Sequence, residues 1–201
     1  MPHIHLQEGL PGIRGLFAFR LETARPMSQL AQVLLHDENT LTRAERELIA
    51  TYVSSLNDCY FCQTIHGAVA AAQLNHDEAL VQKVKTDWIH AEISPKLKAL
   101  LNIAGKVQQD GKLVTQSDVA TARREGATDL EIHDTVLIAA VFCMCNRYVD
   151  GLGTWAPQDL NVYRARAEEI VEHGYSAVTE MAAKSLRPDN GGALLEETAH
   201  H

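Results

Sequence analysis

Apolar residues recur every three or four positions along most of the chain, which is the spacing of an amphipathic helix. Residues 42–56 show it clearly, because Leu48, Ile49, Tyr52 and Val53 fall on one face of a helix drawn through them. No segment shows the alternation of β-branched and polar residues that is typical of a half-buried strand. The pattern therefore predicts an all-α protein with roughly nine helices.

Start and stop signals give these helices their expected limits. Capping boxes begin at Thr42 and Thr128, because each threonine is followed three residues later by a glutamate. Asn57-Asp58 closes the first of these helices and is expected to cap the next one, which begins at Cys59 and runs to about Leu74. The other helices are expected over about 26–35, from 77, and over 95–110, 115–126 and 159–186.

Glycine and proline positions divide the chain into four parts. Residues 1–26 predict an irregular N-terminal arm, 27–155 a helical core, 156–187 a C-terminal helix and 188–201 a flexible Gly-rich tail. The arm is expected to pack on the core, and the C-terminal helix on a neighbouring subunit. The apolar residues expected to make these contacts are Ile13, Leu16, Phe17 and Phe19 in the arm and Ile170, Val171, Tyr175, Val178 and Met181 in the helix.

Charge and composition exclude several classes of function. The formal net charge is -8 at pH 7 and no basic run occurs, so no nucleic-acid partner is expected. No stretch reaches the roughly 18 apolar residues of a membrane span, and the N-terminal residues lack the apolar core of a secretory signal. A cytoplasmic location is therefore expected. With no Gly-rich phosphate loop, neither a nucleotide nor a flavin cofactor is expected.

The chemistry of the sequence is concentrated in residues 57–67, NDCYFCQTIHG. Cys59 and Cys62 lie on one side of a helix start, close enough for a disulfide. The free N–H groups and partial positive charge of a helix N-terminus stabilise a thiolate, so a thiol here is expected to have a pKa below its ordinary value. His66 lies on the same face as Cys62 and can exchange a proton with it, directly or through one water.

Glu47, on the preceding helix, is the candidate partner of His66. The short turn at residues 57–58 makes the two helices neighbours, and Ala50, Thr51 and Ser54 leave the face around Glu47 free of large apolar side chains. A carboxylate in that place would orient the imidazole by a hydrogen bond or favour its protonated, positively charged form. The alternative interpretation is a surface carboxylate beside two arginines.

Other interpretations of the cysteine pair remain open. Structural zinc needs four ligands, of which Cys59, Cys62 and His66 supply three. Two buried thiols beside an ordinary histidine are also possible, whereas haem attachment is excluded because Gln63 follows the second cysteine. Two further cysteines, Cys143 and Cys145, lie in an apolar helix and are expected to be small buried side chains without a mutual disulfide. Arg147 and Asp150, which follow them, are expected to form an ion pair.

The pattern of Glu47, eleven residues, Cys59-x-x-Cys62, three residues and His66 resembles the core of the alkylhydroperoxidase D-like proteins of the carboxymuconolactone decarboxylase superfamily. The stretch from about residue 10 to 155 is similar to the subgroup of uncharacterised peroxidase-related enzymes. The resemblance implies an all-helical, homo-oligomeric protein, a trimer, hexamer or dimer. It also implies a thiol-dependent peroxidase without a metal or cofactor.

Carried over by position, the resemblance makes Cys62 the peroxidatic thiol, Cys59 the resolving thiol, and Glu47 with His66 the proton relay. A peroxide converts Cys62 to a sulfenic acid, Cys59 closes a disulfide, and an external dithiol reductant restores both thiols. The best-studied peroxidases carry a histidine where Phe61 stands, so the pocket is expected to be more apolar, with His66 as the remaining base.

Three other functions stay open on the sequence alone. A disulfide-exchange or redox-sensing protein would have the same cysteine couple but weak peroxidase activity. A non-catalytic helical oligomer would use the cysteines structurally or for zinc. A lyase acting on a small cyclic acid or lactone rests on analogy of fold alone.

Overall fold

The structure is a computed structural model that describes residues 1–185 of the chain. This part is built from helices, and no strand occurs in it, which confirms the all-α prediction. Nine α-helices are present, together with one π-helical turn, η1, and two short 3-10 helices, η2 and η3. Their bounds are α1 Ile13–Phe19, α2 Leu21–Ala31, η1 Gln32–His36, α3 Arg43–Leu56, α4 Tyr60–Gln73, α5 Glu78–Asp87, η2 Trp88–His90, α6 Pro95–Gln109, η3 Gly111–Leu113, α7 Gln116–Arg124, α8 Asp129–Gly151 and α9 Leu160–Ser185.

Side-chain caps begin the helices that the sequence predicts most clearly. Thr42, Thr115 and Thr128 each form a complete capping box, in which the hydroxyl accepts from a backbone N–H and a carboxylate accepts from the threonine N–H. Asp77 and Ser94 accept from the backbone N–H groups at the starts of α5 and α6 in the same way. These local hydrogen bonds explain why the predicted helix starts are correct there.

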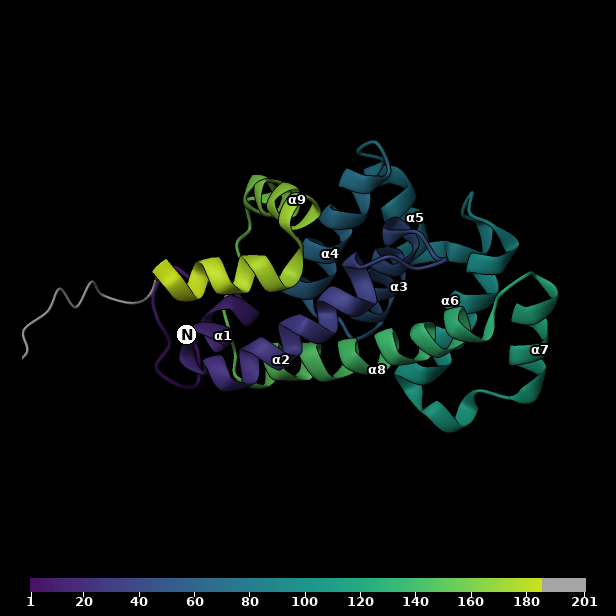
Figure 1. Cartoon of the computed structure of the whole chain (residues 1–201), viewed down its shortest axis with the longest axis horizontal. Helices are drawn as coiled ribbons and strands as arrows, with labels where there is room; N and C mark the ends of the chain where they lie inside the picture. The colour runs from purple at the N-terminus through teal and green to yellow at the C-terminus, as the bar shows by residue number, and fades with distance from the viewer. Residues whose placement is uncertain (186–201) are drawn as a thin grey trace, which may run out of the picture.

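The antiparallel pair α3 and α4 forms the centre of the molecule (Figure 1). Helix α3 packs against α6 and α8 on one side, where the larger apolar core lies. Helix α4 packs against α9, which is bent into two segments that cross α4 and α2. A second buried cluster, which contains Cys59 and Cys62, lies between α1, α4 and α9.

Residues 13–26 are helical apart from Arg20, so the prediction of an irregular N-terminal arm is wrong there, whereas residues 1–12 are irregular as predicted. The arm contains α1 and the first half of α2, and Pro26 lies inside α2 rather than at its start. Burial of Ala24 against α9 favours the helix despite the hydrogen bond that proline cannot donate. Leu16 is fully buried as expected, whereas Phe19 is 63% exposed and does not pack.

Helix α9 packs on its own chain through residues that were expected to contact a neighbouring subunit, and its packing on another subunit stays a prediction. Ile170 is buried against α4, and Val171 and Tyr175 are partly buried, whereas Met181 is 48% exposed. The expected tail, 188–201, and the last residues expected in this helix, 186–187, lie outside the described residues.

The bend in α9 lies at Gly174, whose φ of 73° and ψ of -180° are incompatible with a helix. The Gln32 side chain occupies the space beside it, and its Oε1 accepts hydrogen bonds from the backbone N–H groups of Tyr175 at 2.8 Å and Ser176 at 3.3 Å. Gln32 thus caps the second segment of α9 as an N-cap residue caps a separate helix.

Helix α8 is the one helix in residues 1–185 with the length and mean hydropathy to cross a membrane, judged by composition alone. The core helix of a soluble protein meets the same criterion, so the evidence for a membrane span is weak. The helix packs against α3 and α6 and buries the polar side chains of Glu131, Asp134 and Asn146. The expectation of no membrane association stays a prediction.

Replacing Gly174 with alanine should destabilise the fold. The new Cβ would lie 2.3 Å from Gln32 Oε1, at a backbone conformation almost restricted to glycine. We expect Gly174→Ala to lower the free energy of unfolding by roughly 1–3 kcal/mol, measured by chemical denaturation. Gly111→Ala is the matched control, because no atom lies within 4 Å of its added Cβ. Equal unfolding curves for the two variants would contradict this account of the bend.

Candidate active site

The turn between α3 and α4 places both cysteines of the C-x-x-C motif. Asp58 adopts a left-handed φ of 54°, and the chain enters α4 with Cys59 as the N-cap residue rather than as the first helical residue. The Cys59 N–H donates to the Ser54 carbonyl at 3.1 Å, and no side chain caps α4, contrary to the prediction for Asn57-Asp58. Cys62 then lies in the first turn, so both sulfurs are at the helix N-terminus.

Glu47 and His66 meet as the sequence predicts. The Glu47 Oε2 atom lies 2.8 Å from His66 Nδ1, and the Glu47 side chain is 1% exposed, so the surface-carboxylate interpretation is wrong. Tyr175, from the second segment of α9, donates a hydrogen bond from its hydroxyl to Glu47 Oε1 at 2.5 Å and lies 3.2 Å from His66 Nδ1. Three helices therefore contribute one side chain each to a buried acid–base cluster.

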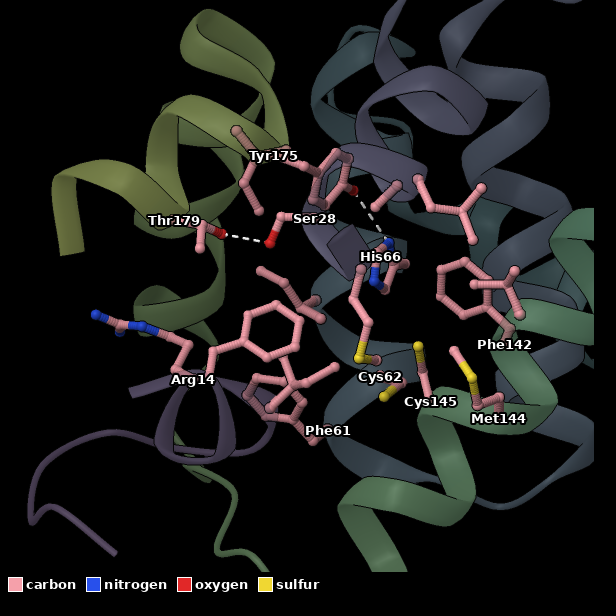
Figure 2. Close-up of a pocket in the computed structure, with 18 of the residues that line it drawn as sticks. Arg14, Ser28, Phe61, Cys62, His66, Phe142, Met144, Cys145, Tyr175 and Thr179 are labelled. Carbon is pink, nitrogen blue, oxygen red and sulfur yellow. Dashed lines mark hydrogen bonds between the residues drawn. The ribbon is translucent and has the colours of Figure 1, made fainter. Parts of the chain in front are cut away.

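The imidazole of His66 is held in one orientation. Phe142 meets it edge-on with ring centroids 4.6 Å apart, and Tyr175 stacks beside it at 5.8 Å. Because Nδ1 faces a carboxylate, we assign the ring proton to Nδ1, which leaves Nε2 as the basic nitrogen. Figure 2 shows the ring between the Tyr175 hydroxyl and the Cys62 sulfur, so Nε2 is on the cysteine side. No hydrogen bond joins His66 to Cys62 among residues 1–185.

Cys62 is a buried thiol and not the acidified one that the helix N-terminus predicted. Its hydrogen-bonding contact with the Cys59 thiol and its burial raise its pKa well above the ordinary value, while the Asn146 amide acts in the opposite direction. Cys59 is 0% exposed and Cys62 is 3% exposed. Desolvation and a second thiol therefore outweigh the favourable field of the helix terminus.

An apolar cavity of about 120 Å³ opens beside Cys62. Cys62, His66, Cys145 and Tyr175 line it, whereas Cys59 is not among the lining residues. The two sulfurs of the motif are therefore not equivalent, because only Cys62 can meet a molecule that occupies the cavity. Phe61 forms part of the wall and fills the space above Gly12, where a Cβ would lie 2.3 Å from its ring.

Sequence reasoning missed three side chains of this site. It placed Tyr175 only on an apolar helix face, although a buried tyrosine hydroxyl needs a hydrogen-bond partner. Asn146 interrupts an apolar run, and its amide accepts from Asn57 Nδ2 at 2.8 Å and donates to Ser54 Oγ at 3.1 Å. Cys145 faces the cavity, and burial together with the nearby Cys59 raises its pKa to about 12.

Two further predictions about the surroundings of the cysteines have different outcomes. Arg147 donates to the Cys143 carbonyl at 2.9 Å, and no ion pair with Asp150 forms, so that prediction is wrong. Partial burial raises the pKa of Asp150, and the Cys59 thiol beside it acts in the opposite direction. No group of three or more His, Cys, Asp or Glu side chains in the described part of the chain is arranged to hold a metal ion.

Tyr175→Phe should destabilise the protein, because it leaves the buried Glu47 carboxylate with one hydrogen bond fewer. The loss of a donor to a buried charged group costs about 1–3 kcal/mol. Tyr60→Phe is the matched control, because Tyr60 is 40% exposed and its hydroxyl has no partner among residues 1–185. The measurement is denaturant unfolding of both variants. A Tyr175→Phe curve that overlays the Tyr60→Phe curve would show that the hydroxyl does not stabilise Glu47.

The raised pKa of Cys62 should appear in its alkylation by iodoacetamide. A thiol reacts as the thiolate, so a raised pKa moves the increase in rate to higher pH than for a free cysteine, whose pKa is about 8.5. We expect the Cys62 rate to keep rising above pH 9, measured by mass spectrometry of the Cys62 peptide. Slow access to a buried sulfur lowers the rate at every pH, whereas a raised pKa moves the pH at which the rate is half-maximal. That pH therefore separates the two effects. A plateau below pH 8 would mean that Cys62 is a thiolate in the resting protein.

Comparison with known proteins agrees with this geometry. Residues 22–82, which include Glu47, Cys59, Cys62 and His66, match the model of the Carboxymuconolactone decarboxylase family. The crystal structure of an uncharacterized peroxidase-related protein from Silicibacter sp. TM1040 is similar, with 27% sequence identity, a TM-score of 0.69, and 77% of this chain and 78% of that chain covered.

A second solved structure is described as an alkylhydroperoxidase AhpD core, an uncharacterized peroxidase-related protein from Ralstonia eutropha JMP134. It has 26% sequence identity and a TM-score of 0.70, with 77% of this chain and 81% of that chain covered. No curated protein matches the chain. The two structural neighbours and the absence of strands in the described residues show that the chain has an all-α, alkylhydroperoxidase D-like fold, and residues 22–82 are similar to the Carboxymuconolactone decarboxylase family.

Proposed function

We propose that the protein is a thiol-dependent hydroperoxide reductase in which Cys62 attacks the peroxide and Cys59 resolves the product. The observation that carries this proposal is the cavity, because it is lined by Cys62 and His66 but not by Cys59. A hydroperoxide in this space meets a sulfur and a base side by side, with the second sulfur behind the first. The names of the two structural neighbours point to the same class of reaction.

In the first step, His66 Nε2 takes the proton of the Cys62 thiol, directly after a small side-chain rotation or through one water. The thiolate attacks the distal oxygen of the hydroperoxide, and the O–O bond breaks. Cys62 becomes a sulfenic acid, and the departing alkoxide takes the proton back from His66 as an alcohol. One thiol and one hydroperoxide thus give one sulfenic acid and one alcohol.

In the second step, Cys59 attacks the Cys62 sulfur, and the sulfenic hydroxyl leaves as water. The spacing of three residues across the N-terminus of α4 suits this intrachain disulfide. An external dithiol then reduces the disulfide by exchange and is itself oxidised. The dithiol reaches the site through the cavity, since the sulfurs are otherwise covered.

Glu47 and Tyr175 support the base rather than touch the substrate. A buried carboxylate beside Nδ1 stabilises the imidazolium that forms when Nε2 takes a proton, as in other carboxylate–histidine pairs. The base is needed because the Cys59 thiol and burial raise the pKa of Cys62, which favours its protonated form. General base catalysis of this kind contributes about 10²- to 10⁴-fold in rate.

The alternative is a disulfide-exchange or redox-sensing protein with weak peroxidase activity. Cys59 and Cys62 are 0% and 3% exposed, so the thiol of an exchange partner, like that of a dithiol reductant protein, reaches Cys62 only through the cavity. A homo-oligomeric assembly, a cytoplasmic location and the absence of nucleic-acid, metal and cofactor partners remain part of the proposal.

A thiol count tests the proposal. Free thiols are measured before and after one equivalent of cumene hydroperoxide, on the native protein and on Cys62→Ser. We expect the native protein to lose two thiols, which dithiothreitol restores, because one peroxide forms one disulfide. Cys62→Ser should lose none, because Cys59 does not line the cavity and Cys145, which does, has a pKa raised to about 12.

Two outcomes would contradict the proposal in different ways. Loss of one thiol in Cys62→Ser, with the oxidation found on the Cys59 peptide and not on the Cys145 peptide, would mean that Cys59 reacts first and that the roles are reversed. No loss in either protein would rule out the peroxidase function. Cys143→Ser is the matched control, because Cys143 is hydrogen-bonded to Asn57 and the Gln108 carbonyl and is not a cavity residue.

A further inference from the structure

Two arginines border the cavity that leads to Cys62. Arg14 comes from α1 and Arg166 from the first segment of α9, and both line the same cavity as Cys62 and His66. Figure 2 shows Arg14 across the cavity from Cys62, with Phe61 on the wall between them and the guanidinium at the outer end of the Arg14 side chain, directed away from the sulfurs. The apolar residues of its lining include Ile13, Phe17, Ile65 and Ile170. The cavity therefore has a sulfur and a base at one end and positive charge at the other.

The positive charge at the arginine end is not neutralised. Arg166 pairs with Glu169, but the Arg14 guanidinium has no hydrogen bond or ion pair to any of residues 1–185. Two guanidiniums and one carboxylate leave one net positive charge there. Burial lowers the pKa of Arg14, the neighbouring Arg166 lowers it further, and Glu169 has the opposite effect. Arg14 is partly exposed, and an arginine stays charged at any physiological pH, so a bound carboxylate would offset the repulsion between the two guanidiniums.

We propose that the site takes an apolar organic hydroperoxide that carries a carboxylate, with the carboxylate bound by Arg14 and Arg166 and the peroxide group at Cys62. This inference rests on the proposed function and adds the substrate class. A guanidinium binds a carboxylate with two parallel hydrogen bonds, which fixes both the position and the direction of the substrate. The anchor orients the molecule so that its peroxide end enters first.

The size of the cavity limits the apolar part of this substrate. An apolar cavity of about 150 Å³ holds a benzene ring. The cavity here, about 120 Å³, is slightly smaller, so it suits a short branched alkyl group, or one ring after a small shift of its side-chain walls. Hydrogen peroxide lacks both an apolar part and a charge, so it would use neither the walls nor the arginines.

Binding without reaction tests the arginine site on its own. The probe is 4-isopropylbenzoate, which has the ring and the carboxylate but no peroxide, and its uncharged counterpart is 4-isopropyltoluene. We expect the native protein to bind the carboxylate at least 10-fold more tightly in calorimetry, and Arg14→Gln to lose that preference. Arg14→Lys keeps the charge and should retain part of it.

Arg164→Gln is the matched control for these variants. Arg164 lies on the same helix as Arg166, but it pairs with Glu78 on the outer surface. Its replacement should leave the preference for the carboxylate at the native value. Equal binding of the two probes to the native protein, or the same loss of preference in Arg14→Gln and Arg164→Gln, would overturn the proposed anchor.

Turnover gives the second measurement, with 4-carboxycumene hydroperoxide and cumene hydroperoxide as a matched pair. The ratio of their kcat/KM values should exceed 10 in the native protein and approach 1 in Arg14→Gln, with the native ratio kept in Arg164→Gln. If 4-isopropylbenzoate binds through Arg14 but neither hydroperoxide oxidises a thiol, the anion site holds and the peroxidase function fails. If both hydroperoxides are reduced at equal rates by the native protein, the peroxidase function holds and the carboxylate anchor fails.

Discussion

The buried carboxylate of Glu47 is the constraint on which the site depends. An ionised carboxylate removed from water is destabilising by several kcal/mol unless charges and hydrogen bonds compensate it. Here His66 and Tyr175 bind its two oxygens, and the charge of Glu47 raises the pKa of Arg46 against the effect of burial. Because these partners come from α3, α4 and α9, satisfying one carboxylate fixes three helices relative to one another.

The position of Tyr175 depends in turn on the π-helical turn η1. Its first residue, Gln32, accepts from Tyr175 and Ser176 through one end of its amide and donates to Asp37 Oδ1 at 2.8 Å through the other. Arg46 holds the same turn by donating to the carbonyls of Leu34 and Asp37 at 3.0 and 2.7 Å. A π turn at the end of α2 thus directs the helix bend that brings the tyrosine to the carboxylate.

Short-range signals in the sequence correctly predicted two features of this arrangement, the helix starts and the contact of Glu47 with His66. The capping boxes at Thr42 and Thr128 give correct helix starts, and the spacing of Glu47, Cys62 and His66 brings two of them together across one short turn. Tyr175 was missed because its position requires contacts between residues more than 100 positions apart in the chain. The raised pKa of Cys62 was also missed, because a helix terminus is visible in a sequence whereas burial on all sides is not.

Phe61 replaces an expected second histidine base and also shapes one wall of the cavity. By the resemblance to the alkylhydroperoxidase D-like proteins, it stands where the best-studied peroxidases carry a histidine. Its ring packs on Tyr163 with centroids 6.0 Å apart and covers Gly12. Gly12 directly precedes α1, which carries Ile13 and Arg14 into the cavity wall. A histidine at this position would be less able to bury itself against the glycine and the tyrosine, because its ring nitrogens need partners. Phe61 thus leaves the site with one proton acceptor fewer. Its contacts with Gly12 also hold α1, which contributes Ile13 and Arg14 to the cavity wall.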